Sequence, residues 1–514
     1  MSKTIIIIGA GLAGLSAVLQ AAENGCNVKL VSSLPSERAQ SVMAEGGINA
    51  ALNTKDENDS PEEHFTDTIK AACGLADPNA VWGMTQAAPE LVHWLLKLGV
   101  KFNMSGYDDV DLRNFGGQKK KRTAFAQSDT GKQIMTAMID AVRRKEASGM
   151  VERFSHHSFL TLRLCGNICC GCVIRDEYSQ ETVELPGDAV IVATGGMHGL
   201  FGNTTGSLSN TGEVTAELFR LGVPLANGEM IQYHPTTVKC GGKRMLISEA
   251  ARGEGGRLFA MKDGKQWYFM EEKYPELGNL MPRDITAREI WKVSHESEVF
   301  LDMTEISEEI ISNKLSGLAD DCMTYLHKDI RKEPVSVLPG IHYFMGGILV
   351  DEQHRTPIQN LYAAGECCAQ YHGANRLGGN SLLGALYGGR VAAKSACEQA
   401  DVVDLSCATQ IDFPPASQIS EIKQLNKVMQ ETMGVVRNEN TLLNGIKTVQ
   451  ALTGNLPLLG MAVLKSALAR KESRGAHWRE DYPKSNDDDY LKTTVARFDG
   501  KQIQISFVPV PERR

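Results

Sequence analysis

The first hydrophobic segment of the chain predicts a buried strand that leads directly into a helix. Residues 5–8 are four consecutive isoleucines, as in a parallel strand covered on both faces. Gly9, Gly11 and Gly14 follow at the spacing of a tight turn that opens a helix. Residues 27–31 predict the next strand. The chain therefore begins with a βαβ unit, and the free N–H groups at the start of its helix can hold a pyrophosphate.

Later hydrophobic segments continue this α/β pattern. Apolar positions recur at helical spacing in residues 61–98 and 132–147, which predicts helices that cover a sheet. From about residue 240 to residue 339 the chain is more polar and its periodicity is weaker. Short buried strands are expected on both sides of this region, at residues 189–196, 346–350 and 361–364. This arrangement indicates a domain inserted into a dinucleotide-binding fold.

The C-terminal part of the chain is predicted to be mainly helical. Helical spacing returns in residues 419–436 and 458–471, and Pro457 marks the start of the second of these helices. Residues 503–510 alternate between apolar and polar side chains and predict an edge strand, where Pro509 is tolerated. The fold class is therefore α/β, with a Rossmann-like domain, an inserted domain and a C-terminal helical domain.

The charge balance excludes nucleic acid as a partner. The 514 residues include 54 Lys and Arg against 62 Asp and Glu, which gives a formal net charge of −8. Such a chain lacks the basic surface that binding to DNA or RNA requires. We therefore look for a small-molecule substrate.

The sequence indicates neither membrane insertion nor secretion. Residues 4–22 are nearly uncharged, but three glycines interrupt them and no basic segment precedes them. The twelve cysteines lack the spacing of a disulfide framework, which favours a reducing compartment. We expect a cytoplasmic protein with no direct membrane insertion, whose association with a membrane would depend on partner subunits.

Four cysteines that lie close in sequence fit either a metal site or a strand. Cys165, Cys169, Cys170 and Cys172 lack the convergent spacing of a zinc or iron–sulfur ligand set. Residues 169–174 fit a strand that passes through a glycine-containing bend, in which Cys170 and Cys172 would share a face. We expect no metal here.

Three longer segments carry a resemblance to a known family. They are Gln232-Tyr-His-Pro-Thr, Ser248-Glu-Ala-Ala-Arg-Gly-Glu-Gly-Gly and His372-Gly-Ala-Asn-Arg-Leu-Gly-Gly-Asn-Ser-Leu-Leu. They resemble the flavoprotein subunits of fumarate reductase and succinate dehydrogenase, a family that includes L-aspartate oxidase. Ser473-Arg-Gly-Ala-His and Asp481-Tyr-Pro extend the resemblance into the C-terminal helices, so that it covers most of the chain.

The resemblance implies an FAD-binding domain in two pieces, a capping domain over the flavin and a helical domain. We expect FAD binding by residues 1–235 and 343–408, capping by residues 236–342, and the helical domain at residues 409–514. The implied FAD contacts are Gly9, Gly11, Gly14, Ser32, Gly46, Gly47, Thr194, Gly195, Glu366, Ser381 and Leu382.

Two serines among these contacts, Ser32 and Ser381, can also be interpreted from their positions alone. Ser32 and Ser33 stand where NAD-binding proteins carry an acidic ribose ligand, which weakens the case for NAD and leaves FAD open. Ser381 is predicted at a helix N-terminus, which would stabilise negative charge on the reduced flavin. The alternative for Ser381 is a plain helix cap.

Gln40 occupies the position at which the resemblance places a covalent flavin link. Family members that oxidise succinate carry a flavin-bonded histidine five residues before the Gln/Glu-Gly-Gly triplet, and counting back from Glu45 gives Gln40. Its amide cannot form that bond, so we expect noncovalent FAD. In this family the covalent link raises the flavin potential, so its absence favours electron flow towards fumarate. Glu45 would add negative charge near the flavin and act in the same direction; its alternative is a solvated turn residue.

Fumarate reduction needs a closed pocket that binds a dianion and protonates one of its carbons. Matching the family's motifs assigns the carboxylate contacts to His234, Ser248, His342 and Arg376, and proton donation to Arg283. A guanidinium normally keeps its proton. Here, however, the acceptor is a carbanion-like carbon, which is a far stronger base than water.

An arginine that donates its proton must receive another one, and this requires a relay of neighbouring groups. Glu249 and Arg252 are three residues apart, so on a helical turn they share a face and could pass protons to Arg283. Their alternative role is a surface ion pair. The surrounding family motif favours the relay.

The leading hypothesis is a fumarate reductase flavoprotein of anaerobic electron transport. L-aspartate oxidase is the first alternative, but the family's oxidases usually carry a Glu-Gly-Gly-His type segment where this chain has Phe115-Gly-Gly-Gln, followed by Arg122-Thr123. A succinate dehydrogenase subunit and a binding component without turnover are the others. The completeness of the cationic set argues against a component without turnover.

The electron donor is expected to be another protein. The family typically docks onto an iron–sulfur subunit, and this chain has no haem-attachment Cys-x-x-Cys-His of its own. Residues 119–122 form a basic run that is expected to be a solvated loop or a docking patch for an acidic donor.

Overall fold

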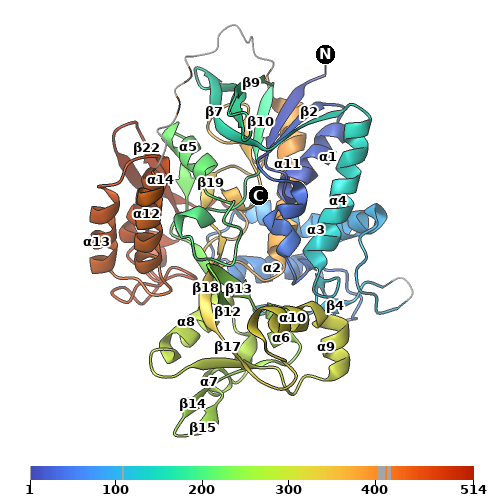
Figure 1. Ribbon diagram of the computed structural model, residues 1–514, viewed down its shortest axis with the longest axis vertical. Coiled ribbons are helices and arrows are strands. Elements are labelled where there is room, and N and C mark those ends of the chain that lie inside the picture. The colour runs from blue at the N-terminus through green and yellow to red at the C-terminus, as the bar shows by residue number, and fades with distance from the viewer. Residues whose placement is uncertain (1, 107–108, 402–410, 412, 414–417) are drawn as a thin grey trace.

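A parallel five-stranded sheet lies at the centre of the N-terminal half (Figure 1). The computed structural model describes residues 2–106, 109–401, 411, 413 and 418–514. The sheet has the order β20-β10-β1-β2-β6, with β1 Thr4–Ile8, β2 Asn27–Ser32, β6 Val151–Ser155, β10 Ala189–Val192 and β20 Leu361–Ala363. Every neighbouring pair is parallel. Because β20 follows the inserted region, the sheet is completed from two distant parts of the chain.

The isoleucine strand β1 divides its side chains between two hydrophobic cores, as the sequence predicts. Ile5 and Ile7 pack on the face covered by helices α1 (Leu12–Glu23), α4 (Thr130–Ala147) and α11 (Asn380–Gln399). Ile6 and Ile8 pack against an antiparallel sheet formed by β7 (His157–Cys165), β8 (Ile168–Asp176) and β9 (Thr182–Pro186). All four isoleucines are buried.

The turn after β1 depends on two glycines for different reasons. Gly9 has φ +110, and a Cβ there would lie 2.2 Å from the carbonyl oxygen of Ala193. A Cβ on Gly14 would lie 1.8 Å from the carbonyl oxygen of Gly9. Gly9 therefore lets the turn pass close to β10, and Gly14 lets α1 pack onto the turn.

The helical pattern of residues 61–98 forms two helices, α2 (Pro61–Ala71) and α3 (Pro78–Leu98). Each begins with a proline at its first position. Asp77 caps α3 by accepting hydrogen bonds from the N–H groups of Asn79 and Ala80. Proline at the first position and a capping side chain before it mark the start of each of these helices.

The cysteine-rich segment forms strand β8, as one of the two alternatives expected. Cys169 and Cys172 join the core against the parallel sheet, and Cys170 instead donates to the carbonyl of Arg163. The expectation that Cys170 and Cys172 share a face is wrong, because Gly171 (φ +137) and a register shift break the alternation. Within the described residues, no group of three His, Cys, Asp or Glu side chains is arranged to hold a metal ion.

The inserted region forms a separate lobe at the bottom of Figure 1, with its own core. Its sheet has the order β15-β14-β16-β17, and a second sheet, β13-β12-β18, connects the lobe to the central sheet's domain. The strands are β12 Ile231–Cys240, β13 Lys243–Leu246, β14 Arg257–Lys262, β15 Lys265–Trp267, β16 Val299–Asp302, β17 Val335–Ser336 and β18 Leu338–Phe344. The helices are α6 Glu249–Gly253, α7 Phe269–Lys273, α8 Arg283–Val293, α9 Glu308–Lys314 and α10 Ser316–Asp321.

The C-terminal part forms a helical layer at the left of Figure 1. It consists of α12 (Ile419–Thr432), α13 (Glu439–Val449) and α14 (Asn455–Ala469), of which α13 was not predicted. The chain then adds β22 (Lys492–Phe498) and β23 (Ile503–Pro509) to a mixed sheet of order β21-β19-β11-β22-β23. The other three strands of this sheet are β11 Leu225–Ala226, β19 Gly347–Leu349 and β21 Cys368–Ala369. The predicted edge strand is confirmed. The α/β class with an inserted lobe and a helical C-terminal part is also confirmed.

Two further expectations concern a domain boundary and insertion into a membrane. The boundary expected at 408–409 lies outside the described residues. In the part of the chain that the structure describes, none of the helices is both long and apolar enough to span a bilayer.

Candidate active site

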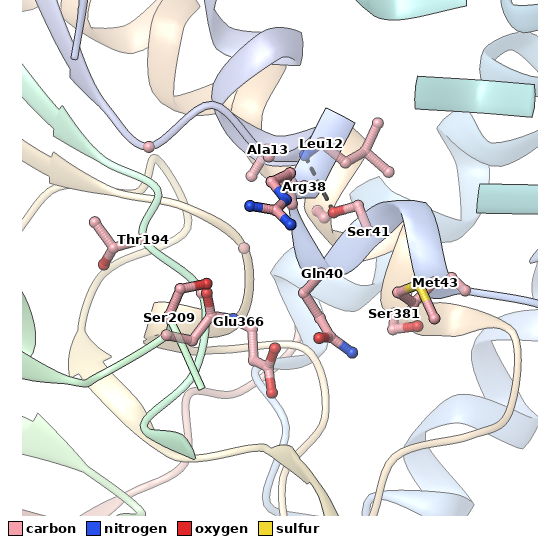
Figure 2. A pocket seen from close by; sticks show the side chains of 18 of the residues that line it. Leu12, Ala13, Arg38, Gln40, Ser41, Met43, Thr194, Ser209, Glu366 and Ser381 are labelled. Carbon is pink, nitrogen blue, oxygen red and sulfur yellow. Dashed lines mark hydrogen bonds between the residues drawn. The ribbon is translucent and has the colours of Figure 1, made fainter. Parts of the chain in front are cut away.

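A single large cavity of about 850 Å³ runs from the glycine turn to the inserted lobe. It is lined by every expected FAD contact except Gly14, and by all four expected carboxylate contacts. Figure 2 shows Thr194, Glu366, Gln40 and Ser381 around one part of it. Gly14 does not line the cavity; its missing side chain lets α1 pack onto the turn, so its proposed contact with FAD remains a prediction.

The part of the cavity at the glycine turn has the chemistry of a dinucleotide site. Helix α1 begins there after the cap residue Gly11; the N–H of Leu12 donates to the Ser41 hydroxyl at 3.2 Å, and Gly11, Leu12 and Ala13 line the cavity at this positive end of the helix. The hydroxyl of Ser32 ends strand β2 in the same place, and among the described residues this buried oxygen has no hydrogen-bond partner. An unpaired hydroxyl at the end of the second strand suits a ribose. The residues present therefore fit FAD.

Helix α11 also directs its N-terminus at the cavity. It begins at Asn380 after the cap residue Gly379 (φ +83), and Ser381 and Leu382 line the cavity in its first turn. The alternative that Ser381 is a plain cap is wrong, because Gly379 takes the cap position and no side chain caps the helix. The positive end of this helix is therefore free to face an anionic group.

Gln40 lies in the short helix η2 (Gln40–Met43) and points into the cavity (Figure 2). Its side-chain oxygen accepts a hydrogen bond from the backbone N–H of Ser207. The amide is thus fixed by the protein at the edge of the site.

Glu45 lines the cavity and is not a solvated turn residue. Burial, together with Asp321 and Asp129, raises the pKa of Glu45 to about 8. Its carboxyl is therefore mostly protonated at neutral pH, and the negative charge expected near the flavin is largely absent there. The sequence could not reveal this, because Asp321 belongs to the inserted lobe and Asp129 to the start of α4.

Arg283 is the first residue of α8 and points from the inserted lobe into the cavity. Its Nε and Nη2 donate to one oxygen of Glu249, at 2.8 and 2.5 Å, and its Nη1 donates to the side-chain oxygen of Gln232 at 3.1 Å. The side chain is 7% exposed. Three donated bonds fix the guanidinium in one orientation at the cavity wall.

Glu249 and Arg252 lie behind Arg283 and are both buried, so they are not a surface pair. The second oxygen of Glu249 lies 3.3 Å from Arg252 Nη2 and accepts from the N–H of Gly116 at 3.1 Å. Although burial alone would raise it, Arg283 and Arg252 hold the pKa of Glu249 below its usual value. Burial lowers the pKa of Arg252. Arg252 does not line the cavity.

His234 and His342 are brought together by the pairing of β12 with β18. In this antiparallel pair His234 lies opposite Gly340, and the two imidazole rings are 5.1 Å apart. Burial, with the nearby charge of Arg283, holds both pKa values well below the usual value, so both rings are neutral at physiological pH. Neutral imidazoles can donate a hydrogen bond to a carboxylate without adding a charge. His342 is oriented by a 2.8 Å hydrogen bond with the Thr205 hydroxyl.

Arg376 and Ser248 complete the set of expected carboxylate contacts. Arg376 lies over the ring of Tyr343, at 4.3 Å, and its Nε is buried without a partner among the described residues. Burial, followed by repulsion from Arg283, lowers the pKa of Arg376 to about 9. Ser248 is the N-cap of α6 and lines the cavity.

Two positioning residues were missed by the sequence analysis. Gln232 joins both halves of the site, since its amide donates to Asn375 and to the carbonyl of Arg376 while its oxygen accepts from Arg283. Its spacing of two from His234 on one strand was the available signal. Tyr343 supports Arg376, and it follows His342 directly.

The segment at residues 115–122 is built into the site. Phe115 lines the cavity, Gly116 contacts Glu249, and Gln118 donates to the carbonyl of Gly378 at 2.9 Å. Arg122 is fully buried and pairs with Asp59 and Asp67 at 2.9 and 3.0 Å. The expectation of a solvated basic run is therefore wrong for Arg122, because its two partners come from the region of α2, far away in sequence.

Comparison with known proteins identifies the relatives of this architecture. A family model described as "FAD binding domain" matches residues 4–382, and one described as "Fumarate reductase flavoprotein C-term" matches residues 452–513. The chain is 38% identical to the succinate dehydrogenase flavoprotein subunit of Bacillus subtilis (strain 168), covering 100% of this chain and 98% of that protein. It is 32% identical to the 8-methylmenaquinol:fumarate reductase flavoprotein subunit of Wolinella succinogenes, covering 100% of this chain and 92% of that protein. A solved structure of a mutant of E. coli quinol fumarate reductase FrdA superposes with a TM-score of 0.90 at 27% identity, covering 99% of this chain and 97% of that one.

Proposed function

Because the chain belongs to the family of succinate dehydrogenase and fumarate reductase flavoproteins, FAD-dependent oxidoreductases that act on a CH–CH bond, we propose that it reduces fumarate to succinate. The observation that carries the proposal is Arg283 at a cavity wall that also carries neutral histidines, with Glu249 and Arg252 paired behind it. Such an array both attracts a dianion and offers it a proton.

FAD would be held by the residues of the glycine turn, Ser32, the loop at Gly46 and Gly47, Thr194, Gly195, Glu366 and the start of α11. When bound, it supplies hydride to the alkene. We propose that it is bound noncovalently, since Gln40 stands at the position of the linking histidine and its amide is already bonded to Ser207. A noncovalent flavin favours the reductive direction over succinate oxidation.

The carboxylates of fumarate would be bound by Arg376, Ser248, His234 and His342. Arg376 supplies a charge and the two neutral histidines supply hydrogen bonds. With Arg283, Arg252 and Arg376 positive and Glu249 negative, these four side chains carry a net charge of about +2 that matches a dianion.

Arg283 would donate the proton that completes the reaction. Its guanidinium is held at the wall by Glu249 and Gln232, so it meets the substrate without a reorganisation cost. Glu249 accepts a hydrogen bond from Arg283 and contacts Arg252. Glu249 and Arg252 would therefore form the path by which a new proton reaches Arg283. The chain's cations thereby bind the substrate and protonate it.

The division into an FAD-binding domain (1–235 and 343–408), a capping domain (236–342) and a helical domain (409–514) is part of this proposal. In it, Arg283, Glu249 and Arg252 come from the capping domain and Arg376 from the FAD-binding domain. Two of the relatives are named as flavoprotein subunits of fumarate reductases. We therefore propose an iron–sulfur subunit as electron donor, and a cytoplasmic protein that reaches a membrane only through such partners.

The activity can be tested with three substrates on the purified flavoprotein. We expect fumarate to reoxidise a reduced viologen dye, succinate to be oxidised more slowly, and aspartate to give no peroxide. The physical reason is that the site offers a proton donor to an alkene dianion. Peroxide from aspartate without fumarate activity would reassign the protein as an L-aspartate oxidase, and faster succinate oxidation would make it a dehydrogenase.

The attachment of FAD can be tested independently of activity. After precipitation of the protein with acid, we expect all of the flavin in the supernatant and none in the pellet, because the Gln40 amide forms no bond to it. Substituting Gln40→His provides the matched comparison. Flavin fluorescence that stays with the denatured wild-type chain would contradict the proposal.

A further inference from the structure

Glu45 lies beside the proposed dicarboxylate site, near the start of α4, the end of α10 and Arg113. Glu45 lines the same cavity as Ser248, whose hydroxyl lowers the pKa of the Glu45 carboxyl but does not outweigh its burial. One carboxyl oxygen, Oε2, is buried and accepts no hydrogen bond from the described residues. An ionised carboxylate in this place would have no donor at Oε2 to stabilise its charge.

The charged and titratable groups around Glu45 favour its neutral form. Asp321 of α10 and Asp129 at the start of α4 face it with negative charge, and Cys322 of the π-helix η5 (Cys322–Leu326) lies nearby. Arg113 of β4 (Leu112–Arg113) is the one cation recorded near it among the described residues, and its guanidinium is directed to the carbonyl of Gln127 and the ring of Phe125. Around Glu45, the single cation Arg113 is therefore outnumbered by the two carboxylates of Asp321 and Asp129.

Substrate binding adds two more negative charges next to this carboxyl. The four charged side chains of the proposed site sum to about +2, which a dianion neutralises without help from Glu45. An ionised Glu45 would leave one uncompensated negative charge beside Ser248. The bound dianion and an ionised Glu45 are therefore mutually destabilising.

We propose that Glu45 is a neutral acid in the dicarboxylate complex, so that binding a dianion takes up one proton whenever the free protein has lost it. This inference rests on the proposed function, because it assumes that the cavity binds a dicarboxylate. Glu45 would then act as a positioning residue: its carboxyl hydrogen can be donated to Ser248, which holds the hydroxyl at the substrate's carboxylate.

The sign of the pH dependence follows from the pKa of Glu45, which is about 8 in the protein without ligand. Below pH 8 the carboxyl is already protonated, so affinity is constant. Above pH 8 a proton must be bound with the ligand, and the dissociation constant rises tenfold for each further pH unit. The direction is thus a loss of affinity as pH rises.

The test uses the FAD-loaded protein and malonate, a dicarboxylate without an alkene. Calorimetry at pH 7.0 and 8.5, in buffers of different ionisation enthalpy, measures both the dissociation constant and the protons taken up. For the wild type we expect the dissociation constant to rise about fourfold and uptake to exceed roughly half a proton per ligand at pH 8.5. For Glu45→Gln we expect a change below about twofold and little uptake, since an amide does not titrate in this range.

A second variant tests the cause and guards against misfolding of the first. Asp321→Asn removes a negative charge that faces Glu45, so the loss of affinity should begin at lower pH than in the wild type. Asp320→Asn removes the same charge from the exposed neighbour and should leave the profile unchanged. Equal proton uptake in the wild type and Glu45→Gln would overturn the inference and leave the proposed function intact. Absence of malonate binding at every pH would instead reject the proposed function.

Discussion

Replacing Arg283 with alanine is expected to lower the rate of fumarate reduction by about 10²- to 10⁴-fold, the range over which positioned acids contribute. The guanidinium is the proposed proton donor, and Arg376, the other cation among the proposed substrate contacts, lacks a hydrogen bond to Glu249. The measurement is the fumarate-dependent reoxidation of a reduced viologen dye, normalised to bound flavin.

The Arg283 experiment needs to separate chemistry from binding and folding. Removing Arg283 also leaves Glu249 with fewer buried donors, which costs stability. Malonate affinity and flavin content are therefore measured on the same samples, and we expect both to change far less than turnover. Arg288→Ala is the matched control, because Arg288 lies on the same helix but stacks on Trp478 at 4.0 Å, away from the cavity. Unchanged turnover in the Arg283 variant would assign this residue to structure.

The fold was predictable where neighbouring residues decide the structure. The four isoleucines and the glycine spacing determine a doubly covered strand and a tight turn, and both are found. Predictions failed where one residue breaks a local pattern. Gly171 shifts the register of β8, so that Cys169 rather than Cys170 shares a face with Cys172.

The site was predictable as a set of residues but not as an environment. Family motifs name His234 and His342, yet only the pairing of β12 with β18 explains why the rings meet. The surroundings of Glu45 and Arg122 depend on carboxylates contributed by distant segments. Charge runs and turn residues carry no information about such partners, so their burial could not be read from the chain.

Replacing Arg376 with methionine is expected to weaken malonate binding by about 3 kcal/mol, or roughly 150-fold, as when one partner of a buried charge pair is truncated. Methionine keeps much of the side-chain length and its contact with the ring of Tyr343 but removes the charge. The dissociation constant is measured by calorimetry on the FAD-loaded protein. Arg390→Met is the control, because Arg390 lies on α11 and pairs with Glu23 outside the cavity.

The pH dependence of malonate binding distinguishes the loss of the Arg376 charge from a change in the shape of the site. Burial lowers the pKa of Arg376 to about 9, so its cation disappears as pH rises through 9 and affinity should fall tenfold for each unit above it. This loss is best observed in Glu45→Gln, in which the earlier change near pH 8 is removed. The double variant Glu45→Gln with Arg376→Met should then bind malonate weakly and independently of pH between 8 and 10. A persistent alkaline loss of affinity in that double variant would show that another cation, and not Arg376, holds the dicarboxylate.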